Sequence, residues 1–238
     1  NVAAEVDFAS EFRFKNRPLP RNTVFFCVSQ SGETADTLAA MREAKRKGFR
    51  ALGLCNNVGS TIARESDGGV YMHAGPEIGV AATKTFLAQI AANYLVGLAL
   101  AQARGTKYPD EVEREYNELV AMPDLVARVL EHIGPVTELG QRFAQSPTVL
   151  FLGRHVGYPV ALEGALKLKE LAYMHAEGFA AGELKHGPIA LIEEGLPVIV
   201  VMPSPKNAAV LHATLLSNIR EIQARGAITI VIAEEGDD

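Results

Sequence analysis

The chain contains 238 residues, of which 48% are hydrophobic, so it can bury a substantial core as one large domain or two small ones. The formal net charge is -5, and the basic residues are dispersed rather than clustered. This excludes the basic surface that a nucleic-acid-binding protein needs, and we expect the partner to be a small molecule.

Apolar runs and helical patterns alternate from the start of the chain. Strands are predicted at residues 2–8, 24–28, 51–55 and 69–72, and helices at residues 35–47, 61–66 and 81–103. Residues 109–143 carry charge and helical periodicity without strand patterns. The alternation then resumes, with strands predicted at residues 149–152, 198–202 and 228–233 and helices at residues 158–175 and 208–225. This order is typical of doubly wound α/β proteins.

We therefore predict an α/β protein with two doubly wound parallel-sheet subdomains, each a flavodoxin- or Rossmann-like three-layer sandwich. They are expected at residues 1–107 and 148–238, joined by a helical connector at residues 108–147. Residues 24–55 and 198–233 also look like repeats, because each reads as a strand, a polar loop, a helix with a basic end and a second strand.

The sequence between residues 86 and 103 is the longest apolar stretch, but it contains Gln89, Asn93 and Gln102. These polar side chains predict a core helix rather than a membrane span. Cys27 and Cys55 each lie in an apolar strand-like run, which suits buried thiols in a reducing compartment. The chain opens without the basic and apolar regions of a secretory signal, and we expect a cytoplasmic protein.

The string Ser29-Gln30-Ser31-Gly32-Glu33-Thr34 joins a buried strand to a helix and predicts a phosphate site. Glycine permits a tight turn, short hydroxyl side chains leave room for phosphate oxygens, and the first free N–H groups of the helix point to the same place. The alternative is an ordinary turn with Ser31 as the N-cap residue. The matching loop of the second repeat, residues 202–207, contains two prolines, so only the first copy is predicted to hold a phosphate.

Glu163, Lys167 and Glu170 recur at spacings i, i+4 and i+7, which places them on one face of a helix. A cation between two carboxylates can keep one of them ionised as a base and polarise a substrate oxygen, although such spacing also occurs on solvated helix faces. His186 lies beside glycine and proline, where an imidazole can act as an acid or a base. The six histidines show no zinc-like spacing with cysteine, and we expect no metal and no cofactor.

Four strings of the sequence together resemble the isomerase half of the glutamine–fructose-6-phosphate aminotransferase family, also called glucosamine-6-phosphate synthase. They are Ser-Gln-Ser-Gly-Glu-Thr-Ala-Asp-Thr at 29–37, Glu-Ile-Gly-Val-Ala at 77–81, Ala-Leu-Glu-Gly-Ala-Leu-Lys-Leu-Lys-Glu at 161–170 and Ala-Gly-Glu-Leu-Lys-His-Gly-Pro at 181–188. The resemblance covers nearly the whole chain in the right order. It implies two sugar isomerase (SIS) subdomains.

The resemblance implies a role for each candidate residue. Ser29, Gln30, Ser31 and Thr34 would hold the sugar phosphate, and Val80 would contact the sugar through its backbone. Glu170 would move a proton between C1 and C2 as a fructose 6-phosphate imine becomes glucosamine 6-phosphate. Lys167 and Glu163 would orient and polarise the reacting oxygens, and His186 would open the sugar ring from the neighbouring subunit of a homodimer.

The sequence also departs from the family pattern. It has no terminal nucleophilic cysteine, so ammonia release from glutamine is expected from a glutaminase domain of a full-length parent. A first strand and helix of the isomerase half and a tail bearing a Schiff-base lysine are also missing, which predicts a fragment. Two alternatives stay open: a non-catalytic SIS module that senses sugar phosphates, and another sugar-phosphate isomerase or deglycase.

Overall fold

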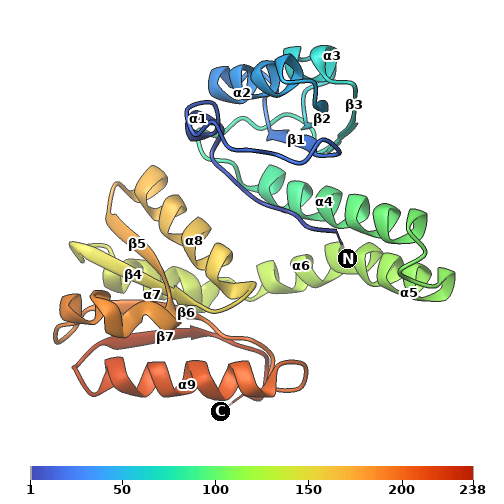
Figure 1. Cartoon of the computed structure of the whole chain (residues 1–238). Helices are drawn as coiled ribbons and strands as arrows, with labels where there is room; N and C mark the ends of the chain where they lie inside the picture. The colour runs from blue at the N-terminus through green and yellow to red at the C-terminus, as the bar shows by residue number, and fades with distance from the viewer. Residues whose placement is uncertain (1, 238) are drawn as a thin grey trace. The chain divides into compact units, whose positions relative to one another are not determined.

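The computed structural model describes residues 2–237, in which helices and parallel strands alternate (Figure 1). The elements are α1 (Ala9–Phe12), β1 (Val24–Ser29), α2 (Ala35–Arg46), β2 (Arg50–Cys55), α3 (Thr61–Glu65), β3 (Gly68–Tyr71), α4 (Lys84–Ala103), α5 (Pro109–Val120), α6 (Met122–Glu131), α7 (Gly134–Phe143), β4 (Thr148–Gly153), α8 (Gly157–Ala172), β5 (His175–Ala180), the 3-10 helices η1 (Ala181–His186) and η2 (Pro188–Leu191), β6 (Pro197–Val201), α9 (Ala209–Gln223) and β7 (Ile228–Ile232). Two compact units, Asn1–Leu130 and Glu131–Asp238, divide the chain within α6.

The first unit contains a parallel sheet with the strand order β1-β2-β3. Helix α2 packs on β1 and β2, and α3 packs on β2. The core between them consists of buried apolar side chains: Cys27, Met41, Ala51, Cys55 and Ile62. Both cysteines are free thiols, as the apolar runs around them predicted.

Helix α4 differs from the prediction of a core helix. It begins at Lys84 rather than at residue 81, and its buried residues are Thr85, Ala92 and Leu98. By length and composition alone α4 could cross a membrane, and only 11% of its apolar window is buried. Helices of soluble proteins pass the same test of length and composition. Because apolar side chains surround this helix instead of forming one stripe, packing against α5 leaves much of its apolar surface exposed.

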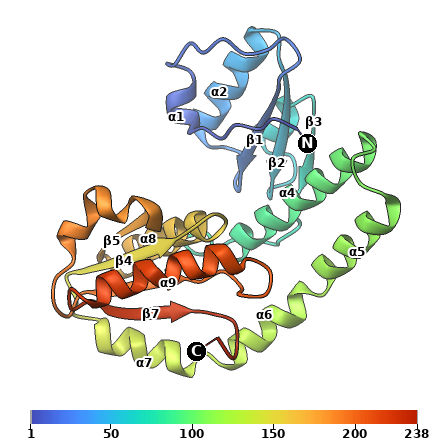
Figure 2. The same ribbon diagram turned by 60° about the horizontal axis from the view of Figure 1, so that its bottom comes forward.

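The second unit contains a parallel sheet with the order β5-β4-β6-β7, covered by α8 on one face and α9 on the other (Figures 1 and 2). Side chains of β4 alternate between the faces, as a strand requires. Val149 and Phe151 pack in one cluster with Ala161 and Ala165 of α8. The side chains of Leu150 and Leu152 pack in another cluster with residues of α9. Both sheets are therefore parallel and have helices packed on them, which confirms the predicted α/β fold class.

Two predicted elements are wrong. Residues 2–8 form no strand, because their backbone pairs with neither sheet and Val6 is fully exposed. The helix predicted at residues 158–175 ends at Ala172, where Tyr173 adopts a left-handed conformation with φ 53°. The next residues form β5, which pairs with β4 from Thr148 beside His175 onward.

The predicted repeats are confirmed as β1–α2–β2 and β6–α9–β7. In each, two strands pair in parallel, with Val24 beside Arg50 in the first and Pro197 beside Ile228 in the second. Between the repeats, α5, α6 and α7 occupy the segment whose periodicity predicted helices.

Candidate functional site

The loop at residues 29–34 leaves the carboxyl end of β1 and enters α2, as predicted. The Oγ atom of Ser29 lies 2.9 Å from Oγ1 of Thr34 and accepts a hydrogen bond of 3.0 Å from the N–H of Gly32. Ser31 is not the N-cap residue, because α2 begins at Ala35 and Thr34 occupies the N-cap position. The hydroxyl of Ser31 instead accepts from the N–H of Glu33 at 3.1 Å. Hydroxyl groups are thus held beside a helix N-terminus, where an anion is stabilised.

Hydrogen bonds from the backbone of α3 hold this loop in place. The carbonyl of Gly32 accepts from the N–H of Ile62 at 3.0 Å, and a carboxylate oxygen of Glu33 accepts from the N–H of Thr61 at 2.8 Å. The hydrogen bond from Thr61 lowers the pKa of Glu33, so this side chain stays ionised at neutral pH. Gly32 has φ +67°, which permits the tight turn that the sequence predicted. The loop is therefore preorganised by its neighbours.

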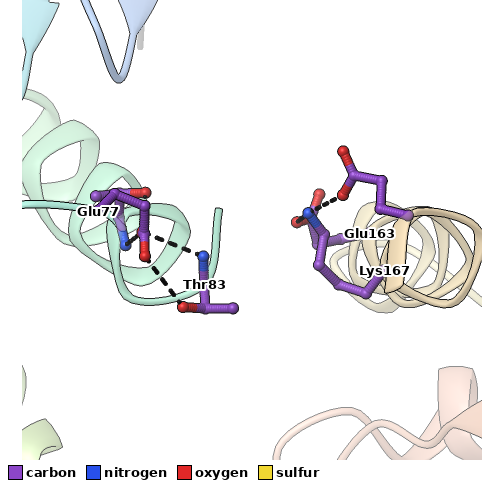
Figure 3. A network of polar contacts seen from close by, with 6 residues as sticks. Glu77, Thr83, Glu163 and Lys167 are labelled. Carbon is purple, nitrogen blue, oxygen red and sulfur yellow. Dashed lines mark hydrogen bonds and ion pairs between the residues drawn. The ribbon is translucent and has the colours of Figure 1, made fainter. Parts of the chain in front are cut away.

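A second segment, residues 74–83, is fixed by Glu77, to which the sequence had assigned no role. Its carboxylate accepts from the N–H of Thr83 at 3.3 Å (Figure 3). It also accepts from the N–H of Thr85 at 3.1 Å and from Oγ1 of Thr85 at 2.6 Å. The hydroxyl of Thr85 is the main cause of a lowered pKa of Glu77. These bonds cap the start of α4, which explains why the helix begins late. Val80 lies inside this segment and is 96% exposed.

In the corresponding loop of the second repeat, the polar side chains pair with a carboxylate of the chain itself. The hydroxyl of Ser204 donates to a carboxylate oxygen of Glu234 at 2.7 Å, and the ammonium of Lys206 pairs with the other oxygen. In the first repeat, the hydroxyls of Ser29 and Thr34 contact each other instead. This difference is consistent with the prediction that only the first loop binds a phosphate.

Helix α8 brings Glu163, Lys167 and Glu170 together, as their spacing predicted. The ammonium Nζ of Lys167 lies 3.3 Å from Oε1 of Glu163 and 2.5 Å from Oε2 of Glu170, and Figure 3 shows the first of these pairs. Partial burial acts to lower the pKa of Lys167, but the hydrogen bonds to Glu170 and Glu163 outweigh it, so this pKa is raised. The network keeps a cation between two half-buried carboxylates, which suits acid–base chemistry.

Close packing on the sheet sets the position of this helix. A Cβ atom on Gly164 would come within 2.7 Å of the Phe151 ring, and one on Gly178 of β5 would come within 3.0 Å of Leu162. The two glycines let α8 lie nearer to β4 and β5 than larger residues would allow.

His186 lies apart from this helix in the chain, at the end of η1, and is exposed. Within residues 2–237, no hydrogen bond or ion pair involves its imidazole.

The predicted site residues thus form two groups, one in each unit. Ser29, Gln30, Ser31 and Thr34 share one loop of the first unit, and Val80 lies on the second segment of the same unit. The network of α8 and the histidine of η1 belong to the second unit. Across the described residues, no group of three or more His, Cys, Asp or Glu side chains is arranged to hold a metal ion.

Comparison with known proteins agrees with the resemblance seen in the four strings. The SIS domain model matches residues 1–99 and 142–238. Over 237 residues the chain is 78% identical to glutamine--fructose-6-phosphate aminotransferase [isomerizing] of Mycolicibacterium paratuberculosis and 76% identical to that of Mycobacterium bovis. All of this chain is covered, but it spans only 38% of the length of these curated relatives.

A solved structure shows the same fold. The C-terminal domain of glucosamine-fructose-6-phosphate aminotransferase from Francisella tularensis superposes with a TM-score of 0.93 at 37% sequence identity. The match covers 97% of this chain and 64% of that one. The chain is therefore similar in sequence and in fold to the isomerase part that the four strings indicated.

Proposed function

This chain belongs to the SIS domain family, and on that premise we propose that it forms part of the sugar-isomerase region of a glutamine–fructose-6-phosphate aminotransferase. The full-length protein would convert fructose 6-phosphate and ammonia to glucosamine 6-phosphate. The ammonia would come from glutamine through a glutaminase domain outside this chain. The names of the curated relatives and their identity of up to 78% support this proposal.

The observation that carries the proposal is the network on α8. An aldose–ketose interconversion moves a proton between adjacent carbons, so it needs a base that removes the proton and returns it. The carboxylate of Glu170 is half-buried and lies 2.5 Å from the ammonium of Lys167. A proton transfer of this kind changes no oxidation state of the protein and requires neither a metal nor a redox cofactor. A module that only senses sugar phosphates has no use for such a base.

In this proposal Glu170 carries the proton between C1 and C2, while Lys167 and Glu163 orient and polarise the reacting oxygens. The loop of Ser29, Gln30, Ser31 and Thr34 binds the phosphate of the sugar. Its hydroxyls and the N-terminus of α2 supply donors for the phosphate oxygens. The backbone of Val80 contacts the sugar.

We further propose a homodimer in which His186 of one subunit opens the sugar ring bound to the other. The exposure of His186 supports this role, because its imidazole is accessible to a second chain. An apolar face on α4 offers a surface for such an assembly: Leu87, Ile90 and Tyr94 follow helical spacing and are 51%, 49% and 44% exposed. The buried free thiols of Cys27 and Cys55 suit a reducing cytoplasm.

Replacement of Glu170 by glutamine in the full-length protein tests the enzyme proposal. The amide keeps the shape of the side chain but cannot act as a base, so fructose 6-phosphate binding should persist while turnover falls by about 10²- to 10⁴-fold. Glu138→Gln, at an exposed position on α7, is the matched control and should leave turnover unchanged. Normal turnover and normal solvent exchange of the C1–C2 proton in Glu170→Gln would favour a sensor or another isomerase with a different base.

A further inference from the structure

Asn56 lies directly after β2 and is buried, with 8% of its surface exposed. Its backbone N–H donates at 3.0 Å to the carbonyl of Gln30, which lies in the loop at residues 29–34, called the phosphate loop below. Its side chain bonds to a different segment: Nδ2 donates to the carbonyl of Gly75 at 2.7 Å, and Oδ1 accepts from the N–H of Ala74 at 3.0 Å. One buried residue therefore connects the phosphate loop to the segment that carries Val80.

The side chain at this position must both donate and accept. An amide supplies a donor and an acceptor from one planar group, and it pairs with the peptide groups of Ala74 and Gly75 as another backbone would. An aspartate at position 56 would place a carboxylate oxygen against the Gly75 carbonyl. The chain turns sharply where this segment begins, since His73 and Gly75 have φ 53° and 69°. Such a turn persists only where surrounding contacts hold it.

Both ends of the segment are thus fixed independently. Asn56 holds Ala74 and Gly75 at its start, and Glu77 holds Thr83 and Thr85 at its end. Between them, Pro76 and residues 78–80, which include Val80, are exposed, whereas Ala81 is buried. Their position relative to the phosphate loop depends on the Asn56 side chain, because its bonds join the start of the segment to a residue whose backbone holds that loop.

We propose that Asn56 is a positioning residue that sets the distance between the phosphate loop and the segment of Val80, and so matches the site to a hexose phosphate. This inference rests on the proposed function. Asn56 itself does not contact the substrate. Its side chain acts on the sugar-facing segment, whereas its backbone N–H, which every substitution except proline retains, acts on the phosphate loop.

The test compares two ligands, fructose 6-phosphate and inorganic phosphate, binding to the full-length protein by calorimetry. Asn56→Ala and Asn56→Asp should each weaken fructose 6-phosphate by about 10-fold or more, the effect of losing one or two buried hydrogen bonds. Inorganic phosphate should change by less than about 2-fold, because the loop keeps its backbone bond. Asn57→Ala and Asn57→Asp, at the exposed neighbouring position, are the matched controls and should change neither affinity.

A second measurement separates this inference from the proposed function. Hydrogen exchange of peptides that contain Ala74 should be slow in the wild type and fast in Asn56→Ala, whatever the ligand. Equal weakening of both ligands, unchanged binding of fructose 6-phosphate, or unchanged exchange at Ala74 would each overturn the positioning role. If the wild type binds phosphate but not fructose 6-phosphate, the proposed function fails, and the exchange experiment alone then decides whether Asn56 holds the segment.

Discussion

Gly32 is the position at which the phosphate loop should be least tolerant of any side chain. It has φ +67°, and a Cβ atom there would lie 2.0 Å from Oγ and 2.5 Å from Cβ of Ser60. Gly32→Ala should therefore incur a left-handed backbone cost of about 1–2 kcal/mol and an overpacking cost of about 1–3 kcal/mol. Because the clash displaces the loop, hexose phosphate affinity should fall at least about tenfold, which corresponds to about 1.4 kcal/mol.

The chain offers a control that separates these two costs. Gly48 also has a left-handed φ, +85°, but no atom lies within 4 Å of a Cβ built there. Gly48→Ala should show the backbone cost alone and leave the affinity unchanged. Ser60→Gly removes both clashing atoms, so Gly32→Ala added to Ser60→Gly should show the backbone cost and only the smaller strain of a 3.2 Å contact with Sγ of Cys55. Urea denaturation and calorimetry measure these effects, and equal destabilisation by Gly32→Ala and Gly48→Ala would refute the steric argument.

Two other predictions concern the assembly and the core. Mixing full-length Ser31→Ala/Thr34→Ala subunits with His186→Ala subunits should restore part of the activity if the site is shared, and a verified mixed dimer without recovery would exclude sharing. Burial, with a smaller effect of Cys55, raises the pKa of Cys27 to about 12 from its usual 9.0. The unfolded chain loses this proton first, so the free energy of unfolding should fall between those pH values by up to about 1.4 kcal/mol per pH unit. Urea denaturation should show that the free energy of unfolding falls less over this pH range in Cys27→Ala than in the wild type.

Most of the fold could be predicted because buried parallel strands and the helices beside them have strong sequence patterns. Strand β5 could not be predicted because His175–Ala180 contains no β-branched residue, has Phe179 as its single large apolar residue and includes Gly178. The reason for that glycine is tertiary, since a Cβ atom there would meet the backbone of Leu162 on α8. No local pattern reports such a contact, and none shows that Tyr173 ends α8 in a left-handed conformation.

The candidate site likewise contains features that local sequence predicts and features that only the folded chain shows. Spacing along one helix predicted that Lys167 would lie between Glu163 and Glu170, because the relevant geometry is local. The roles of Asn56 and Glu77 depend on residues brought near by folding, so no local sequence pattern identifies them. Glu77 stood inside a string that carried the resemblance, but its bonds to Thr83 and Thr85 appear only in the structure.

The string at residues 161–170 combines small residues that packing requires with three charged residues on one helix face, and this combination makes it distinctive. Ala161 and Ala165 are buried against the sheet, and Gly164 brings the helix close to Phe151. Large side chains at these positions would lift the helix and move the charges with it. The ion pairs of Lys167 with Glu163 and Glu170 lie at the spacings i, i+4 and i+7, on a face that stays only partly buried. Packing therefore requires small residues beside the charged ones, so substitution of Ala161, Gly164 or Ala165 should also displace the charges.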